Sequence, residues 1–111
     1  MDTKRQAYEF IDKHRDGMLR LWEKMVNIDS GPGCKEGVDQ VGRLLADCFA
    51  EFGGKNRFYE FKDAGNMLVS EFGNCSEPFI ILTGHMDTVF KAGTVSERPF
   101  KIEDDKAYGP G

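Results

Sequence analysis

The sequence predicts an α/β protein in which helices cover both faces of a sheet, that is, a layered α/β/α arrangement. Two segments with the helical spacing of apolar residues come first, and segments with the residue pattern of strands follow them. The run at residues 79–83 is apolar on both faces, which is typical of a central strand with helices above and below it. No linker or internal repeat interrupts the 111 residues, so we expect residues 1–111 to form one domain.

The first predicted helix occupies the start of the chain. Thr3 followed by Gln6 resembles a capping box, which would begin the helix there. Gly17 could bend the helix or divide it into two shorter ones. His14 has no carboxylate three or four positions later, so it is interpreted as a structural histidine on the apolar face. That face consists of residues spaced by three and four: Ala7, Phe10, Ile11, His14, Met18, Leu21, Trp22, Met25 and Val26.

Ser30-Gly31-Pro32-Gly33 ends the first helical pattern, and a second predicted helix follows it. The loop superficially resembles a phosphate-binding loop, but it follows a helix and no Gly-Lys-Ser/Thr comes after it, so we interpret it as a helix–helix connection. Gly53-Gly54 is a typical end for the second helix. Its predicted buried face consists of Val38, Val41, Leu44, Leu45, Cys48, Phe49 and Phe52.

Strand patterns begin after the second helix. Residues 57–62 alternate aromatic with polar side chains, as a half-buried strand does. Ala64-Gly65-Asn66 predicts a turn, and residues 67–72 predict the next strand. The apolar run at 79–83 is the third predicted strand, and it is the one expected at the centre of the sheet.

The last segments are shorter. Residues 93–96 are predicted as a loop, and residues 100–102 and 106–108 are predicted to pair as a small hairpin. Asp104 and Asp105 could pass for a pair of metal ligands. Their place between two short strands is better explained by a turn.

Composition excludes several classes of function. The formal charge of −4, without a basic stripe, argues against nucleic-acid binding. No apolar run approaches the ~20 residues of a membrane-spanning helix, and no signal peptide is recognisable, so no membrane partner is expected. Cys34, Cys48 and Cys75 form no Cys-x-x-Cys pair, which argues against a disulfide framework and against a cysteine zinc site. We therefore expect a cytoplasmic protein with reduced thiols.

His85 and Asp87 carry the strongest chemical signal. They follow the predicted central strand directly, and functional groups in α/β sheets gather beyond the carboxyl ends of strands. A neutral imidazole is a common zinc ligand, and it needs an acceptor on its other ring nitrogen to fix its tautomer and orientation. The carboxylate of Asp87 is a candidate for that acceptor. By itself the spacing is a weak signal, because a histidine near a carboxylate is more often a simple polar pair.

The surrounding sequence resembles a known family. Residues 83–89, Thr-Gly-His-Met-Asp-Thr-Val, resemble the first metal motif of the co-catalytic zinc aminoacylase and carboxypeptidase family, which includes the glutamate carboxypeptidases. Residues 93–100 and the Tyr-Gly-Pro-Gly at 108–111 resemble the stretch that joins this motif to the second one. The order helix–helix–strand–strand–strand also follows the amino-terminal layout of the family, so the resemblance covers essentially the whole chain.

This resemblance implies the amino-terminal part of a phosphorylase/hydrolase-like zinc peptidase catalytic domain. It implies two zinc ions that hydrolyse an amide bond in a small peptide or N-acyl amino acid, with a carboxy-terminal glutamate as the favoured substrate group. By the same resemblance His85 is a zinc ligand, Asp87 is the catalytic carboxylate that orients it, and Ser30 lies near the mouth of the active site.

The resemblance also implies that further residues are needed. The aspartate that bridges both metals would come three positions after Gly111, and the glutamate general base and the lid domain would follow. We therefore expect the 111 residues to be a truncated portion of the domain, inactive by itself and poor in metal affinity. Two alternatives stay open: a non-enzymatic module in which His85 and Asp87 are vestigial, and a split enzyme completed by a second polypeptide. Uncovered apolar surface predicts self-association.

Overall fold

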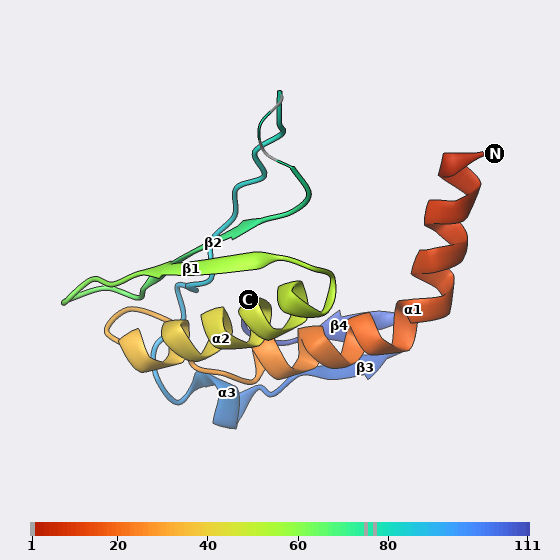
Figure 1. The fold of residues 1–111 in the computed structure, drawn as a ribbon. Coiled ribbons are helices and arrows are strands. Elements are labelled where there is room, and N and C mark those ends of the chain that lie inside the picture. Colours follow the sequence, from red (N-terminus) through yellow and green to blue (C-terminus); the bar gives the residue numbers. More distant parts are fainter. Residues whose placement is uncertain (1, 75, 77) are drawn as a thin grey trace.

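The computed structural model describes residues 2–74, 76 and 78–111, and it contains both helices and antiparallel sheets (Figure 1). Strands β1 and β2 pair with each other, and β3 pairs with β4. The predicted mixture of helices and strands is confirmed, whereas a wider sheet with helices on both faces is not seen among these residues. The elements in chain order are α1 (Thr3–Val26), α2 (Lys35–Glu51), β1 (Lys55–Tyr59), β2 (Met67–Glu71), α3 (Thr94–Glu97), β3 (Lys101–Glu103) and β4 (Lys106–Tyr108).

Helix α1 begins one residue earlier than the capping-box pattern predicted. The Asp2 carboxylate accepts hydrogen bonds from the backbone N–H groups of Lys4 and Arg5, at 3.1 and 3.4 Å. A carboxylate at this position also interacts favourably with the positive end of the helix dipole. Gly17 lies inside one continuous helix of 24 residues, and Figure 1 shows that this helix is bent rather than divided.

The apolar face of α1 is only partly covered. Val26 is buried, but Phe10, Ile11 and Trp22 each keep more than 40% of their surface exposed. The Trp22 ring contacts the ring of Phe100 edge to face, with centroids 5.4 Å apart. Trp22, which its spacing places on the apolar face of this helix, is therefore not a buried core residue in this structure. Figure 1 shows the amino-terminal half of α1, which carries Phe10 and Ile11, extending away from the other elements, so that few residues can cover these two side chains.

His14 has the structural role that its position on α1 predicted. Its ring stacks on Phe10 with centroids 4.0 Å apart, and its Nδ1 lies 2.8 Å from the Phe10 carbonyl oxygen. Because that oxygen can only accept, Nδ1 carries the proton.

Helix α2 ends at the predicted pair of glycines. The N–H of Gly53 donates to the Ala50 carbonyl at 3.0 Å, and the N–H of Gly54 donates to the Phe49 carbonyl at 2.8 Å. This is the Schellman arrangement, which satisfies carbonyls that the helix end would otherwise leave unpaired. Gly53 adopts φ +82°, a left-handed conformation that favours a residue without a Cβ.

The β1–β2 hairpin packs along α2 (Figure 1). Its register runs from the pair Lys55–Glu71 to the pair Tyr59–Met67, so β1 begins two residues earlier and ends three residues earlier than the predicted strand at 57–62. Asn56 donates from Nδ2 to the Ala46 carbonyl at 2.7 Å, which joins the strand to the helix. The small core consists of the buried apolar residues Val41 and Ala46 of α2 and Val26 of α1.

A polar cluster fastens the β1–β2 turn to the start of α2. The buried Asp39 carboxylate accepts from the Asn66 N–H at 2.7 Å and from Lys35 Nζ at 2.9 Å. Lys35 Nζ also donates to the Ala64 carbonyl and to Asn66 Oδ1. The Asn66 N–H, and secondly Lys35, lower the pKa of Asp39 against the opposing effect of burial. The carboxylate is therefore held in its charged form.

The predicted central strand is the main correction. Residues 79–83 form no strand here, and Phe79, Ile80, Ile81 and Leu82 keep 64, 88, 70 and 92% of their surface exposed. A strand that is apolar on both faces needs neighbouring strands and two covering layers. The described part of the chain supplies neither, because β2 pairs with β1 alone. Figure 1 shows the connection between β2 and α3 projecting from the body of the molecule. Cys75, predicted in a loop within this connection, lies outside the described residues.

The predicted hairpin near the end of the chain is confirmed. Strands β3 and β4 pair in the register Ile102–Ala107, and Asp104 and Asp105 form the turn with φ of 50° and 61°. Two consecutive left-handed residues are typical of the tight turn whose twist suits a hairpin. Their role as turn residues agrees with the prediction.

A short helix replaces the loop that was predicted at residues 93–96. Helix α3 begins after Gly93, and the Asp29 carboxylate accepts from the N–H groups of Gly93 and Val95 at 2.8 and 3.2 Å. This cap comes from a residue more than sixty positions earlier, which explains why the local pattern did not predict the helix. In the part of the chain that the structure describes, no helix is both long enough and apolar enough to cross a membrane.

Candidate functional site

The segment that carries His85 and Asp87 is held by the loop between α1 and α2. The Thr88 N–H donates to the Ser30 carbonyl at 2.9 Å, and Ser30 is almost completely buried. Gly31 lies so close to the Phe90 carbonyl that a Cβ at this position would collide with it. The predicted helix–helix connection therefore also supports the candidate site, and it requires a glycine to do so.

Met86 anchors the same segment on its other side. A Cβ built on Gly42 of α2 would lie 3.5 Å from the Met86 sulfur and 3.3 Å from the Phe58 ring, so all three meet closely. His85 and Asp87 flank Met86, and successive side chains of an extended backbone point to opposite sides. With Met86 directed inward, the side chains of His85 and Asp87 remain 82% and 66% exposed.

His85 and Asp87 are brought together by the fold. His85 Nδ1 lies 2.8 Å from the Asp87 carbonyl oxygen and 3.2 Å from its carboxylate Oδ1. Both oxygens are acceptors at neutral pH, so Nδ1 carries the proton, and the lone pair of the neutral ring is on Nε2. Such a ring can bind a metal through Nε2 while Nδ1 holds its orientation. The closer acceptor is the backbone carbonyl rather than the predicted carboxylate.

The described residues fit a metal only in part. His85 has the tautomer and exposure of a single ligand, but no group of three or more His, Cys, Asp or Glu within the described ranges gathers where it could hold a metal ion. A catalytic zinc site has about three protein ligands. Cys34 and Cys48 are free thiols and join no such group. We therefore derive no catalytic step through zinc from these residues, and the roles assigned to His85 and Asp87 stay predictions.

Asp29 was not identified from the sequence, although it helps to shape this region. Its carboxylate binds the start of α3, while the next residue, Ser30, binds Thr88 through its carbonyl. Two adjacent residues thus fix both ends of the stretch 88–95. A half-buried carboxylate after a helix is a weak local signal, and its partners 64 and 66 positions away could not be predicted from the local sequence.

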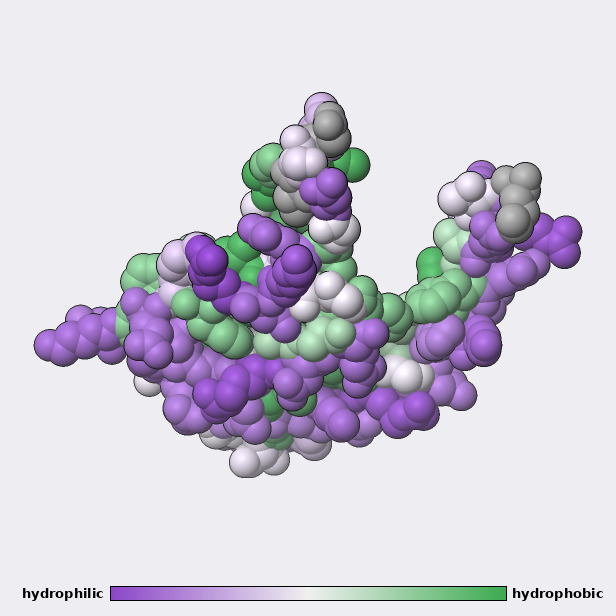
Figure 2. Space-filling view, viewed as in Figure 1, coloured by the Kyte–Doolittle hydropathy of each residue, from purple (hydrophilic) through white to green (hydrophobic). Residues whose placement is uncertain are grey.

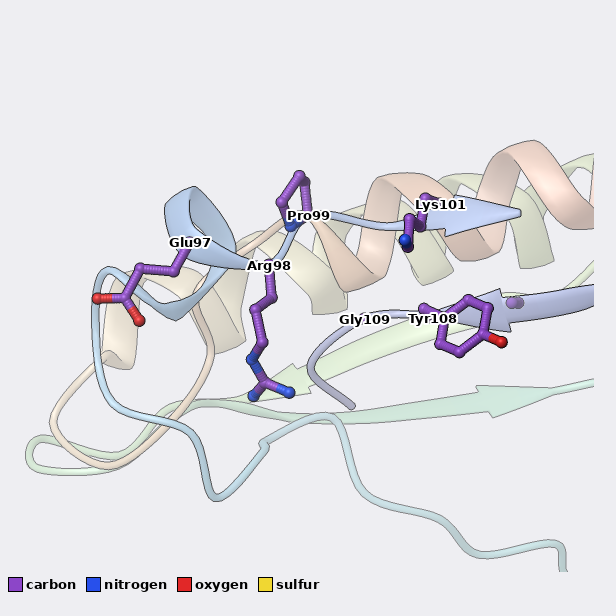
Figure 3. A pocket seen from close by; sticks show the side chains of 7 residues that line it. Glu97, Arg98, Pro99, Lys101, Tyr108 and Gly109 are labelled. Carbon is purple, nitrogen blue, oxygen red and sulfur yellow. The ribbon is translucent and has the colours of Figure 1, made fainter. Parts of the chain in front are cut away.

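A separate open groove of about 610 Å³ lies between the end of α3 and the β3–β4 hairpin (Figure 3). The Arg98 guanidinium lies over the Phe90 ring at 5.2 Å from its centroid. Lys101 Nζ lies over the Tyr108 ring at 5.3 Å and pairs with Glu103 at 2.9 Å. Neither His85 nor Asp87 lines this groove, so the groove and the imidazole form two distinct features.

Comparison with known proteins gives the chain a relative. It is 34% identical over 108 residues to carboxypeptidase G2 of Pseudomonas sp. (strain RS-16). The alignment includes 94% of this chain, which spans only about a quarter (26%) of the relative's length. No family model matches the chain. The similarity supports a carboxypeptidase-like origin, and with it a hydrolase family.

Proposed function

We propose that this chain forms the amino-terminal portion of the catalytic domain of a zinc-dependent carboxypeptidase-like hydrolase of the aminoacylase and carboxypeptidase family. The observation that carries the proposal is the similarity to carboxypeptidase G2 over nearly the whole chain. In this proposal the domain is a layered α/β/α structure when complete, and residues 79–83 are then its central strand. The substrate is a small peptide or N-acyl amino acid with a carboxy-terminal glutamate.

His85 is the proposed zinc ligand, and Asp87 is its positioning residue. The support for these roles is the tautomer that the two Asp87 oxygens impose, with the Nε2 lone pair free on an exposed ring. When bound, zinc would polarise the amide carbonyl and lower the pKa of a water molecule. The residues of this chain contribute the orientation of one imidazole, and the contacts of Ser30 and Met86 keep it in place. The remaining ligands have to come from residues other than those described here, on the same or another polypeptide.

A chimera tests the proposed function. This chain would replace the aligned segment of carboxypeptidase G2, and the release of glutamate from an N-acyl glutamate would be measured with zinc present. We expect a zinc-loaded chimera with carboxypeptidase activity, whereas the 111 residues alone should show none. A chimera that folds and holds zinc, as judged by circular dichroism and metal analysis, but hydrolyses no such substrate would refute the proposed activity. That outcome would favour a non-enzymatic module.

Metal binding by His85 can be tested on the chain itself, because the protein has one other histidine, His14, as an internal control. Cobalt(II), a paramagnetic substitute for zinc, should broaden the ring proton NMR signals of His85 at least about tenfold more than those of His14. We expect weak binding, since one imidazole provides about a third of a zinc site. Equal broadening at both rings, or unchanged metal affinity in His85→Ala, would contradict the assignment. His14→Ala should leave the metal response unchanged.

A further inference from the structure

One peptide group joins the His85 imidazole to the loop between α1 and α2. The carbonyl oxygen of Asp87 lies 2.8 Å from His85 Nδ1. The N–H of the same peptide group belongs to Thr88, and it donates to the Ser30 carbonyl at 2.9 Å. Because a peptide group is planar, the direction of its N–H also sets the direction of its C=O. The Ser30 carbonyl therefore determines where the acceptor of the His85 ring lies.

The part of the loop that contacts the candidate site, residues 29–31, is itself braced by α2. Gly37, in the first turn of α2, lies so close to the Asp29 carbonyl that a Cβ there would collide with it. The Cys34 N–H donates to the Gly31 carbonyl at 3.0 Å. Closely packed backbone has little room to shift. This loop is therefore a firm support for the groups that it contacts.

The segment that follows the shared peptide group is fastened to the same loop. The Asp29 carboxylate accepts from the N–H groups of Gly93 and Val95 at 2.8 and 3.2 Å. Gly31 lies against the Phe90 carbonyl, too close to carry a Cβ. The loop thus holds this segment at two further points, so the peptide group at its start keeps one orientation.

The described stretch before His85 lies outside the body of the molecule. Figure 2 shows hydrophobic side chains on a projecting arm, and Figure 1 shows that this arm is the connection between β2 and α3. Residues 79–83 belong to it and form no strand. In this chain the ring is held from its carboxyl side, so the contribution of the loop can be measured directly.

We propose that Asp29, Ser30 and Gly31 are positioning residues for His85, and that they act through the Asp87–Thr88 peptide group. They select the Nδ1–H tautomer and so leave the lone pair on Nε2, in one direction. The inference rests on the proposed function only for the role of this imidazole as a zinc ligand. The orientation of the ring itself requires no zinc.

Two hydrogen bonds that share one amide strengthen each other. An amide whose N–H donates has a more polarised carbonyl, which is then a better acceptor. This favours the backbone oxygen of Asp87, at 2.8 Å from His85 Nδ1, over its carboxylate Oδ1 at 3.2 Å. Loss of one hydrogen bond changes an equilibrium by roughly three- to tenfold. The ratio of the two His85 tautomers should therefore respond to the loop by about this factor.

Nitrogen-15 NMR of the imidazole rings in the whole chain tests the proposal, because protonated and unprotonated ring nitrogens differ widely in chemical shift. The spectra are recorded in alkaline solution, where imidazoles are neutral. Wild-type His85 should be mainly the Nδ1–H tautomer. Gly31→Ala places a Cβ against the Phe90 carbonyl, which should push the segment away and stretch the bond between Ser30 and Thr88. The ratio of Nδ1–H to Nε2–H at His85 should then fall at least about fivefold.

Gly84→Ala is the matched control. It makes the same substitution next to His85, but a Cβ built there meets none of the described atoms within 4 Å. The tautomer ratio should stay within about twofold of wild type. Asp87→Asn should also keep the ratio within about twofold, because it preserves the backbone carbonyl. His14, whose Nδ1 is bonded inside α1, is the internal reference in every spectrum.

Asp29→Ala tests the loop without adding a side-chain atom to it. It removes the acceptor for the start of α3, and the ratio at His85 should fall about threefold. Asp29→Asn keeps one acceptor oxygen and should restore most of the wild-type ratio. Circular dichroism shows whether each variant is folded. If Gly31→Ala is folded, an unchanged ratio overturns the proposal; if it is not, an unchanged ratio in Asp29→Ala does so. A wild-type ring in the Nε2–H form would also overturn it.

Kinetics in the chimera with carboxypeptidase G2 separate this inference from the proposed function. Gly31→Ala should lower kcat on the order of tenfold and leave KM within about threefold, since the loop supports a metal ligand rather than the substrate. A change in KM alone would contradict the positioning role and would place the loop at the substrate. An inactive wild-type chimera would count against the proposed function, and the tautomer ratio, measured without zinc or substrate, would still decide the inference.

Discussion

In the chimera with carboxypeptidase G2, the His85→Ala substitution is expected to lower kcat/KM more than about 100-fold. Residues that only orient a metal ligand typically account for a 10- to 100-fold loss, and the loss of the ligand itself should exceed this range. The zinc content of the purified variant should fall together with activity. Both quantities are measured on the same preparation, kcat/KM from initial rates and zinc by atomic absorption.

Asp87→Asn in the same chimera should lower kcat/KM less than His85→Ala does, on the order of tenfold. The nearer acceptor of the His85 Nδ1–H is the backbone carbonyl of residue 87 at 2.8 Å, which asparagine keeps, while the carboxylate at 3.2 Å is the more distant one. His14→Ala is the control and should leave kcat/KM within about twofold, since the His14 ring is stacked on Phe10 in α1. A chimera that keeps its zinc and its rate without His85 would remove the basis of the assignment.

Elements stabilised by neighbouring residues were predictable from the sequence. The end of α2 depends on Gly53 and Gly54, and the β3–β4 turn depends on Asp104 and Asp105, so each lies within a few residues of the bonds that it forms. The closeness of His85 to Asp87 was also predictable, because two positions along an extended chain leave little freedom.

Features that depend on distant partners could not be read from local patterns. Helix α3 is capped by Asp29, and Thr88 is fixed by the Ser30 carbonyl. At residues 79–83 the local pattern did predict a strand, but the structure forms none there. These residues specify a buried strand, but burial depends on neighbouring strands that no described residue provides, so the side chains remain exposed. An apolar run indicates that a segment is stable when buried, whereas its actual burial depends on neighbouring strands and covering layers elsewhere in the structure.

The second large effect is expected at Asp39, where substitution by alanine should lower the free energy of unfolding by about 2–3 kcal/mol. A hydrogen bond to a charged group contributes about 1.5–3 kcal/mol, and this buried carboxylate accepts two, from the Asn66 N–H and from Lys35 Nζ. Its removal leaves the Asn66 N–H without its acceptor in a half-buried turn. Because the buried apolar core is small, the loss should be a large fraction of the total stability. Urea denaturation followed by circular dichroism measures it.

The difference in the free energy of unfolding between wild type and Asp39→Ala should depend on pH, and this dependence identifies its origin. The Asn66 N–H and Lys35 lower the pKa of Asp39 in the folded chain, relative to about 3.9 when unfolded. The stabilisation from the charged carboxylate is therefore fully present above pH 5, and it is lost as the pH falls through the folded pKa. The gap between wild type and Asp39→Ala should be constant from pH 5 to 8 and should narrow below about pH 4.

Glu36→Ala is the matched control for Asp39→Ala. Glu36 also lies in α2 and also pairs with a cation, since Arg43 Nη2 is 2.7 Å from its carboxylate, but both side chains are more than half exposed. Exposed ion pairs of this kind contribute about 0–1 kcal/mol, because water competes for both charges. Equal losses at positions 36 and 39 would mean that net charge, rather than the buried contacts of the turn, accounts for the effect. An effect of Asp39→Ala that did not change between pH 3 and 7 would show that its ionisation contributes nothing to the stability of the fold.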